Sequence, residues 1–169
     1  ANLRESLQVE LRLLQQKLGI TTVMVTHDQR EAMTMSDIIV VMNRGQIEQV
    51  GPPIDVYRNP NTAFSARFLG STNLLRGVRT GSGVAEICGT TFELGNDRFP
   101  MNGKDVVVSA RPSDIVLSPA AKDGLAQSAP NHLRGTVTFV RDLGATFECF
   151  VDTVHAEPMI VQGASRDLG

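Results

Sequence analysis

The residues best suited to chemistry lie together near position 27, where one histidine is flanked by polar and acidic side chains. Thr26, His27 and Asp28 follow the apolar residues 23–25, and Glu31 lies three positions beyond Asp28. Asp28 and Glu31 have the spacing of a capping box, in which two side chains pair with free amides at a helix start. The pattern predicts a buried strand at residues 23–25, then a polar turn and a helix, with His27 beside the strand end, where ligand sites of parallel sheets lie. Taken alone, a histidine in such a turn is more often a local hydrogen-bonding group than a catalytic one.

A second candidate is the charged pair Arg111 and Asp114, which follows a short apolar stretch and encloses Pro112. An arginine at a strand end can clamp an anion through two parallel N–H groups. This makes Arg111 a candidate ligand-binding or regulatory residue, with Asp114 as its nearby partner. A structural arginine–carboxylate pair is the commoner arrangement, and the sequence leaves both interpretations open.

Composition and charge exclude several classes of protein. The 169 residues are 41% hydrophobic and 20% charged, which is typical of a globular chain and not of a disordered tail. A net charge of -2 with no visible basic face argues against a nucleic-acid partner. No apolar run is long enough to span a bilayer and no signal peptide is visible, so we expect a soluble, cytoplasmic protein. Cys88 and Cys149 have no ligand-like neighbours, so we expect small buried residues and no zinc site or disulfide.

The elements that would position His27 begin with a helix. Apolar residues recur every three or four positions between residues 3 and 18, which predicts an amphipathic helix that Gly19 ends. A short helix is expected after Asp28. The unbroken apolar run 38–42 then predicts a second strand, buried on both faces.

The next segment reads as a hairpin followed by helices. Residues 46–50 alternate polar and apolar, as the return arm of a hairpin with one solvated face does. A short helix is predicted to begin at Pro53, and another near residues 61–62 that ends at Gly70. We place a domain boundary at Gly70, because the pattern changes there.

Beyond Gly70 short strands alternate with turn residues. They are predicted at residues 74–78, 84–88, 91–94, 105–110, 115–117, 133–140, 146–151 and 156–161. Gly81-Ser82-Gly83 reads as a hairpin turn and not as a phosphate site. Residues 119–131 have little apolar content and are expected to be a surface loop. Together these segments predict a small antiparallel barrel.

The histidine segment resembles a known family. Thr26-His27-Asp28-Gln29, followed by Glu31-Ala32-Met33 and Asp37, closely resembles the switch-histidine region of ABC-transporter ATPase subunits, above all importer subunits of the maltose, polyamine and ferric-iron type. Residues 51–70 resemble the segment that closes the nucleotide-binding domain of these subunits. Residues 106–115, with residues 135–144, resemble the transport-associated OB-like domain that follows it.

The resemblance implies a fold, a role for His27 and a set of partners. The implied fold is α+β, with residues 1–70 as the C-terminal α/β remnant of an ABC ATPase domain of the P-loop NTPase class and residues 71–169 as an OB-like antiparallel β-barrel. His27 would contact the γ-phosphate of ATP and help to hold the attacking water, with ATP and Mg2+ as cofactors of the intact subunit. The implied partners are a second copy of the chain, the transmembrane permease subunits and, indirectly, an external substrate-binding protein. The implied location is peripheral, on the inner face of the bacterial cell membrane.

Several functions stay open. The leading one is an ATP-hydrolysing import subunit, with polyamine-type or related small-ion uptake favoured because residues 68–75 and 111–115 look closer to that group. A sugar-importer ATPase subunit is the alternative within the family. Outside it, the chain could be a stand-alone OB-like module that binds a ligand or dimerises. A module for single-stranded nucleic acid is disfavoured, since the chain has one Tyr and no Trp to stack on bases.

The chain lacks the motifs that hold the phosphates of ATP. It contains no G-x-x-x-x-G-K-[ST] phosphate loop, no signature sequence and no apolar strand ending in paired acidic residues. We therefore expect a C-terminal fragment of an active ATPase that is itself inactive.

We predict that the isolated chain neither binds ATP tightly nor hydrolyses it, because one histidine cannot replace the phosphate-binding amides, their lysine and the metal-binding groups. Calorimetric titration with magnesium ATP measures the binding, and phosphate release measures the hydrolysis. Submicromolar affinity or magnesium-dependent phosphate release would contradict the prediction.

Overall fold

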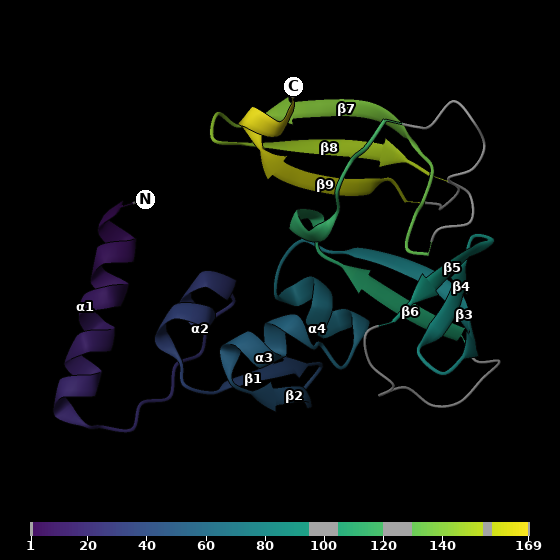
Figure 1. The fold of residues 1–169 in the computed structure, drawn as a ribbon. Helices are drawn as coiled ribbons and strands as arrows, with labels where there is room; N and C mark the ends of the chain where they lie inside the picture. Colours follow the sequence, from purple (N-terminus) through teal and green to yellow (C-terminus); the bar gives the residue numbers. More distant parts are fainter. Residues whose placement is uncertain (1, 95–104, 120–129, 154–156, 169) are drawn as a thin grey trace. The chain divides into compact units, whose positions relative to one another are not determined.

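The chain divides into two compact units, unit 1 (Ala1–Gly70) and unit 2 (Ser71–Gly169). The computed structural model describes residues 2–94, 105–119, 130–153 and 157–168 (Figure 1). Each unit has its own apolar core and is described by itself. In the described part of the chain, no helix combines the length and the apolar character needed to cross a membrane.

Unit 1 consists, in its described residues, of four helices and one hairpin. Its described helices are α1 Asn2–Leu18, α2 Gln29–Met35, α3 Pro53–Arg58 and α4 Ala63–Phe68, and its strands are β1 Ile39–Asn43 and β2 Gln46–Gly51. The helices and the hairpin predicted from the sequence are confirmed at these places. Arg44 and Gly45 join the strands with φ of 49° and 79°, which suits the primed turns of tight hairpins. The core lies between the hairpin and the helices α2, α3 and α4, and its buried members are Ile39, Val41, Val56 and Leu69.

Two burial predictions for unit 1 are wrong. Residues 23–25 form no strand, and the side chains of Val23 and Val25 are 88% and 96% exposed. Strand β1 is buried on one face only, because the exposed residues Val40 and Met42 alternate along it with the buried residues Ile39 and Val41. The reason is that the described sheet of this unit contains β1 and β2 alone, so no further strand can pair with residues 23–25 or cover the second face of β1.

Unit 2 is built from two antiparallel sheets. In the first, the order is β5-β4-β3-β6, with β3 Asn73–Gly81, β4 Val84–Ile87, β5 Thr90–Glu93 and β6 Asp105–Ala110. In the second, the order is β7-β8-β9, with β7 Thr136–Asp142, β8 Thr146–Asp152 and β9 Met159–Ala164. Among the described residues, two single-turn helices accompany them, η1 Pro112–Asp114 and η3 Ser165–Leu168. One core is shared by both sheets, and its buried members are Leu75, Ile87, Phe147, Cys149, Val151, Met159 and Val161.

The α+β class and the antiparallel strands are confirmed, whereas the closed barrel is not seen in the described residues. The two sheets are joined at Asn73 through its side chain. The amide of Asn73 donates to the carbonyl of Ile160 at 2.8 Å and accepts from the N–H of Ile160 at 2.7 Å. The side chain thus makes a pair of bonds that a neighbouring strand would otherwise make, and the hydrogen-bond ladder does not continue between the sheets.

Other predictions for unit 2 have mixed outcomes. The turn at residues 81–83 is confirmed, since it joins β3 to β4. The strand predicted at residues 115–117 is wrong, because that segment follows η1 in an irregular conformation. Most of the predicted loop 119–131 lies outside the described residues. Cys149 is buried as expected, and burial raises the pKa of its thiol, whereas Cys88 is exposed in the β4–β5 turn.

Gly77 in β3 provides a test of this packing. A Cβ at Gly77 would lie 2.4 Å from the carbonyl oxygen of Glu86 and 2.6 Å from Cγ1 of Ile87. Gly77→Ala is therefore expected to lower the free energy of unfolding by about 2 kcal/mol, as overpacking does, measured by urea denaturation. Gly81→Ala is the matched control in the same strand, because its Cβ would meet only Val84, at 3.8 Å. Equal midpoints for the two variants would contradict the close approach of β4 to Gly77.

Candidate functional site

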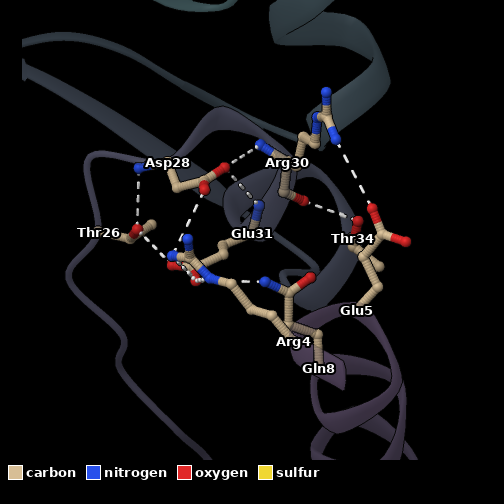
Figure 2. A network of polar contacts seen from close by, with 8 residues as sticks. All are labelled: Arg4, Glu5, Gln8, Thr26, Asp28, Arg30, Glu31 and Thr34. Carbon is tan, nitrogen blue, oxygen red and sulfur yellow. Dashed lines mark hydrogen bonds and ion pairs between the residues drawn. The ribbon is translucent and has the colours of Figure 1, made fainter. Parts of the chain in front are cut away.

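The polar contacts between α1 and α2 centre on the carboxylate of Glu31 (Figure 2). From α1, Nε and Nη2 of Arg4 donate to Oε1 of Glu31 at 3.1 and 2.6 Å, and Nε2 of Gln8 donates to the same oxygen at 3.2 Å. From the turn before α2, the hydroxyl of Thr26 donates to Oε2 at 2.6 Å. The two oxygens of Glu31 therefore face two different segments, and one carboxylate connects them.

Asp28 caps α2 and completes this network. Its Oδ1 accepts from the backbone N–H groups of Arg30 at 2.9 Å and Glu31 at 3.4 Å, which is the geometry of an N-cap. The predicted capping box is thus half confirmed. Its second half is replaced, because the N–H of Asp28 donates to the Thr26 hydroxyl at 2.9 Å while Glu31 binds Thr26 and Arg4.

A second ion pair ties α1 to Asp37, just beyond the C-terminal end of α2. Arg12 binds Asp37 through both terminal nitrogens, one of them at 3.2 Å from Oδ2, and it also donates to Oε1 of Gln15 at 3.0 Å. Between two exposed side chains, Nη1 of Arg30 lies 3.6 Å from Oε1 of Glu5. The contacts between the two helices are therefore largely polar, and they lie at both ends of α2.

These contacts lower the pKa of two carboxyl groups. The pKa of Glu31 is lowered first by the hydrogen bond from Thr26 and then by the bond and charge of Arg4. The pKa of Asp37 is lowered chiefly by the hydrogen bond from Arg12. In both cases the partner stabilises the charged form, which places negative charge at fixed positions beside α1.

His27 lies in the bend between the two residues that this network holds. Its side chain is exposed, while Thr26 and Asp28 on either side are partly covered and hydrogen-bonded. An exposed imidazole on a fixed backbone can donate to or accept from a ligand outside the chain. In the part of the chain that the structure describes, no cluster of His, Cys, Asp or Glu is suited to a metal ion.

Arg111 and Asp114 lie in unit 2, at η1. Arg111 is buried, and its Nη1 donates to the backbone carbonyl of Ser71 at 3.3 Å. Asp114 is exposed, its N–H donates to the carbonyl of Arg111 at 2.9 Å, and its carboxylate accepts from the Ser113 hydroxyl. The guanidinium of Arg111 is thus used at least in part to fix the start of unit 2, and its ligand-binding role stays a prediction.

Sequence reasoning missed the contribution of α1. Arg4, Gln8 and Arg12 follow one another at intervals of four, so they lie on one face of the helix. Their partners are the acidic residues 28, 31 and 37, which stand close together in the sequence. A basic and polar row of this period, ahead of an acidic cluster, is the signal that would have indicated the contact.

Comparison with known proteins gives relatives along most of the chain. The chain is 44% identical over 152 residues to the spermidine/putrescine import ATP-binding protein PotA of Acetivibrio thermocellus, covering 89% of this chain and 40% of the relative. It is 41% identical over 167 residues to the protein of the same name from Desulfitobacterium hafniense, covering 99% and 45%. It is 48% identical over 121 residues to the Fe(3+) ions import ATP-binding protein FbpC 2 of Rhizobium meliloti, covering 72% and 30%.

The chain spans less than half the length of these relatives. No protein-family model matches it. The resemblance drawn from the histidine segment is confirmed by the relatives, all of which are import ATP-binding proteins.

The lowered pKa values of Glu31 and Asp37 predict that acid loosens α1 from α2. A carboxylate with a lowered pKa stabilises the folded state above its ordinary pKa, here 4.5 for Glu31 and 3.8 for Asp37, and the gain is lost as the pH falls through the lowered value. Amide hydrogen exchange of α1 should therefore quicken, relative to its intrinsic rate, as the pH falls below about 4.5.

In the double variant Glu31→Gln with Asp37→Asn, the amides of α1 should exchange faster at neutral pH, and their exchange should change less as the pH falls. Glu10→Gln is the control, because Glu10 is an exposed carboxylate on α1 outside the network. An acid response that is the same in the double variant as in the parent chain would contradict this account.

Proposed function

We propose that this chain, a homologue of the ATP-binding subunits of ABC importers, carries the phosphate-contacting histidine of such a subunit. The observation behind the proposal is the exposed imidazole of His27 on a backbone held by Thr26 and Asp28. The homology to import ATP-binding proteins gives this imidazole a substrate, ATP, whose terminal phosphate carries negative charge.

The chemistry of His27 fits a contact to that phosphate. A ring N–H can donate to a phosphate oxygen, and the opposite ring nitrogen can orient a water molecule beside it. Because its neighbours in the chain are anchored, the ring needs little reorganisation to meet charge that develops during phosphoryl transfer. ATP with Mg2+ supplies the phosphoanhydride bond that is cleaved in the intact subunit. The sequence of the chain contains no phosphate loop.

We further propose that unit 1 is the C-terminal part of the nucleotide-binding domain and that unit 2 is an OB-like, transport-associated domain. The two sheets of unit 2 around one core support the second assignment. In this proposal unit 2 serves dimer contacts and regulation. The partners are a second copy, the permease subunits and, indirectly, an external binding protein, at the inner face of the cell membrane.

For the cargo we propose polyamines. The support is that the relatives from Acetivibrio thermocellus and Desulfitobacterium hafniense are named for spermidine and putrescine import, while a third is named for Fe(3+) ions. An ATP-binding subunit does not contact the cargo, so no residue of this chain selects it. Uptake of labelled spermidine in cells lacking the gene decides the class, with sugar uptake as the control. Loss of sugar uptake with intact spermidine uptake would contradict polyamine import.

In a protein that carries the complete ATP site, we predict that His27→Ala lowers kcat for ATP about a hundredfold or more, with little change in KM. This is the order of loss for removal of one preorganised transition-state contact. The measurement is steady-state phosphate release by the assembled transporter. His132→Ala is the control, because His132 is a second exposed histidine whose ring nitrogen lies 2.7 Å from the carbonyl of Pro130 in unit 2. An unchanged kcat for His27→Ala would reduce His27 to a turn residue.

A further inference from the structure

We propose that Arg4 and Glu31 are positioning residues that hold the backbone on both sides of His27, so that helix α1 controls the direction of the imidazole. The inference rests on the proposed function of His27. Neither Arg4 nor Glu31 would contact the reacting groups. Both would affect the reaction through the orientation of His27.

The first support is that both neighbours of His27 are fixed by side chains of the network. The Thr26 hydroxyl donates to Oε2 of Glu31 at 2.6 Å and accepts from the N–H of Asp28 at 2.9 Å. The Asp28 carboxylate accepts from the N–H groups of Arg30 and Glu31. The backbone therefore enters and leaves His27 at two anchored residues, and Glu31 takes part in the contacts on both sides.

The second support is that Arg4 contacts the carboxylates of both Asp28 and Glu31. Its Nη2 lies 2.6 Å from Oε1 of Glu31 and 3.4 Å from Oδ2 of Asp28. One guanidinium between two carboxylates offsets their mutual repulsion, which would otherwise push Asp28 and Glu31 apart. Figure 2 shows Arg4 and Gln8 approaching this group from α1, opposite to Thr26.

The third support is the different exposure of the two partners. The side chain of Glu31 is 18% exposed, whereas that of Arg4 is 65% exposed. A carboxylate that is largely covered from solvent is costly unless it is hydrogen-bonded, and these hydrogen bonds restrict its side chain to few conformations. Glu31 is therefore the rigid centre, and Arg4 is the adjustable contact through which movement of α1 reaches the turn.

Arg12 provides the matched control. It pairs with Asp37 beyond the other end of α2, so it also ties α1 to α2 but touches neither neighbour of His27. If general docking of α1 set the imidazole, Arg4→Ala and Arg12→Ala would have equal effects. If Arg4 and Glu31 act on the turn directly, only Arg4→Ala and Glu31→Gln should change the mobility of the His27 backbone.

The first experiment uses nuclear relaxation of the His27 backbone amide in the purified chain. We expect an order parameter of about 0.85 in the parent chain and below about 0.6 in Arg4→Ala and Glu31→Gln, the values of rigid and flexible backbone. The Arg12→Ala chain should keep the parent value, and the amide of His132 should be the same in all chains. Loss of order in Arg12→Ala equal to that in Arg4→Ala, or no loss in either, would overturn the proposal.

The second experiment is a double-mutant cycle in a protein that carries the complete ATP site. Arg4→Ala should lower kcat about fivefold, the order of coupling between members of one hydrogen-bond network, with KM for ATP nearly unchanged. Added to His27→Ala, it should cause no further loss, because its effect passes through the imidazole. An equal loss in both backgrounds would overturn the proposal. Failure of the proposed function is distinguishable, since it would show as an unchanged kcat for His27→Ala whatever the order parameters are.

Discussion

The carboxylate of Glu31 is the contact on which the histidine turn of this protein depends. Its two oxygens serve two segments that are distant in the sequence, with Thr26 on one side and Arg4 and Gln8 on the other. A carboxylate that is largely covered is costly unless each oxygen is paired, so the arrangement is specific to this set of partners. Removal of one partner would leave the charged carboxylate of Glu31 incompletely paired, while its remaining partners still hold it. In this way the carboxylate links the turn that contains His27 to helix α1.

Helix α1 is held in an unusual manner, by its polar face. The partly covered positions along it are Gln8, Arg12 and Gln15, while leucines such as Leu7 and Leu11 are exposed. A helix of this kind usually gains most of its stability by burying an apolar stripe. Here the stripe is uncovered, and hydrogen bonds and ion pairs of modest individual strength take its place.

In unit 2, a polar side chain likewise makes a connection that is usually made by other means, here by backbone hydrogen bonds. Its two sheets share one apolar core, but the described strands of the two sheets join through the amide of Asn73 and not through a continuous ladder. The side-chain amide carries an N–H donor and a carbonyl acceptor side by side, as a peptide group does, so it can bond both backbone groups of Ile160. At Gly77 the absence of a side chain permits a close approach of β4. The residue types at positions 73 and 77 are therefore explained by contacts between strands and not by local backbone preference.

The sequence by itself determined the local elements of this protein. The period of the apolar residues located α1, the capping spacing located α2, and turn residues located most strands, because these signals act between residues a few positions apart. The same local signals, with the resemblance to importer subunits, identified His27 as the candidate site residue. Burial was decided only by the tertiary structure. Val23 and Val25 are apolar yet exposed, since a strand is buried by neighbours and not by its own composition. The roles of Arg4 and Asn73 likewise depend on partners 27 and 87 residues away in the sequence, and a pairing over such distances follows from the fold alone.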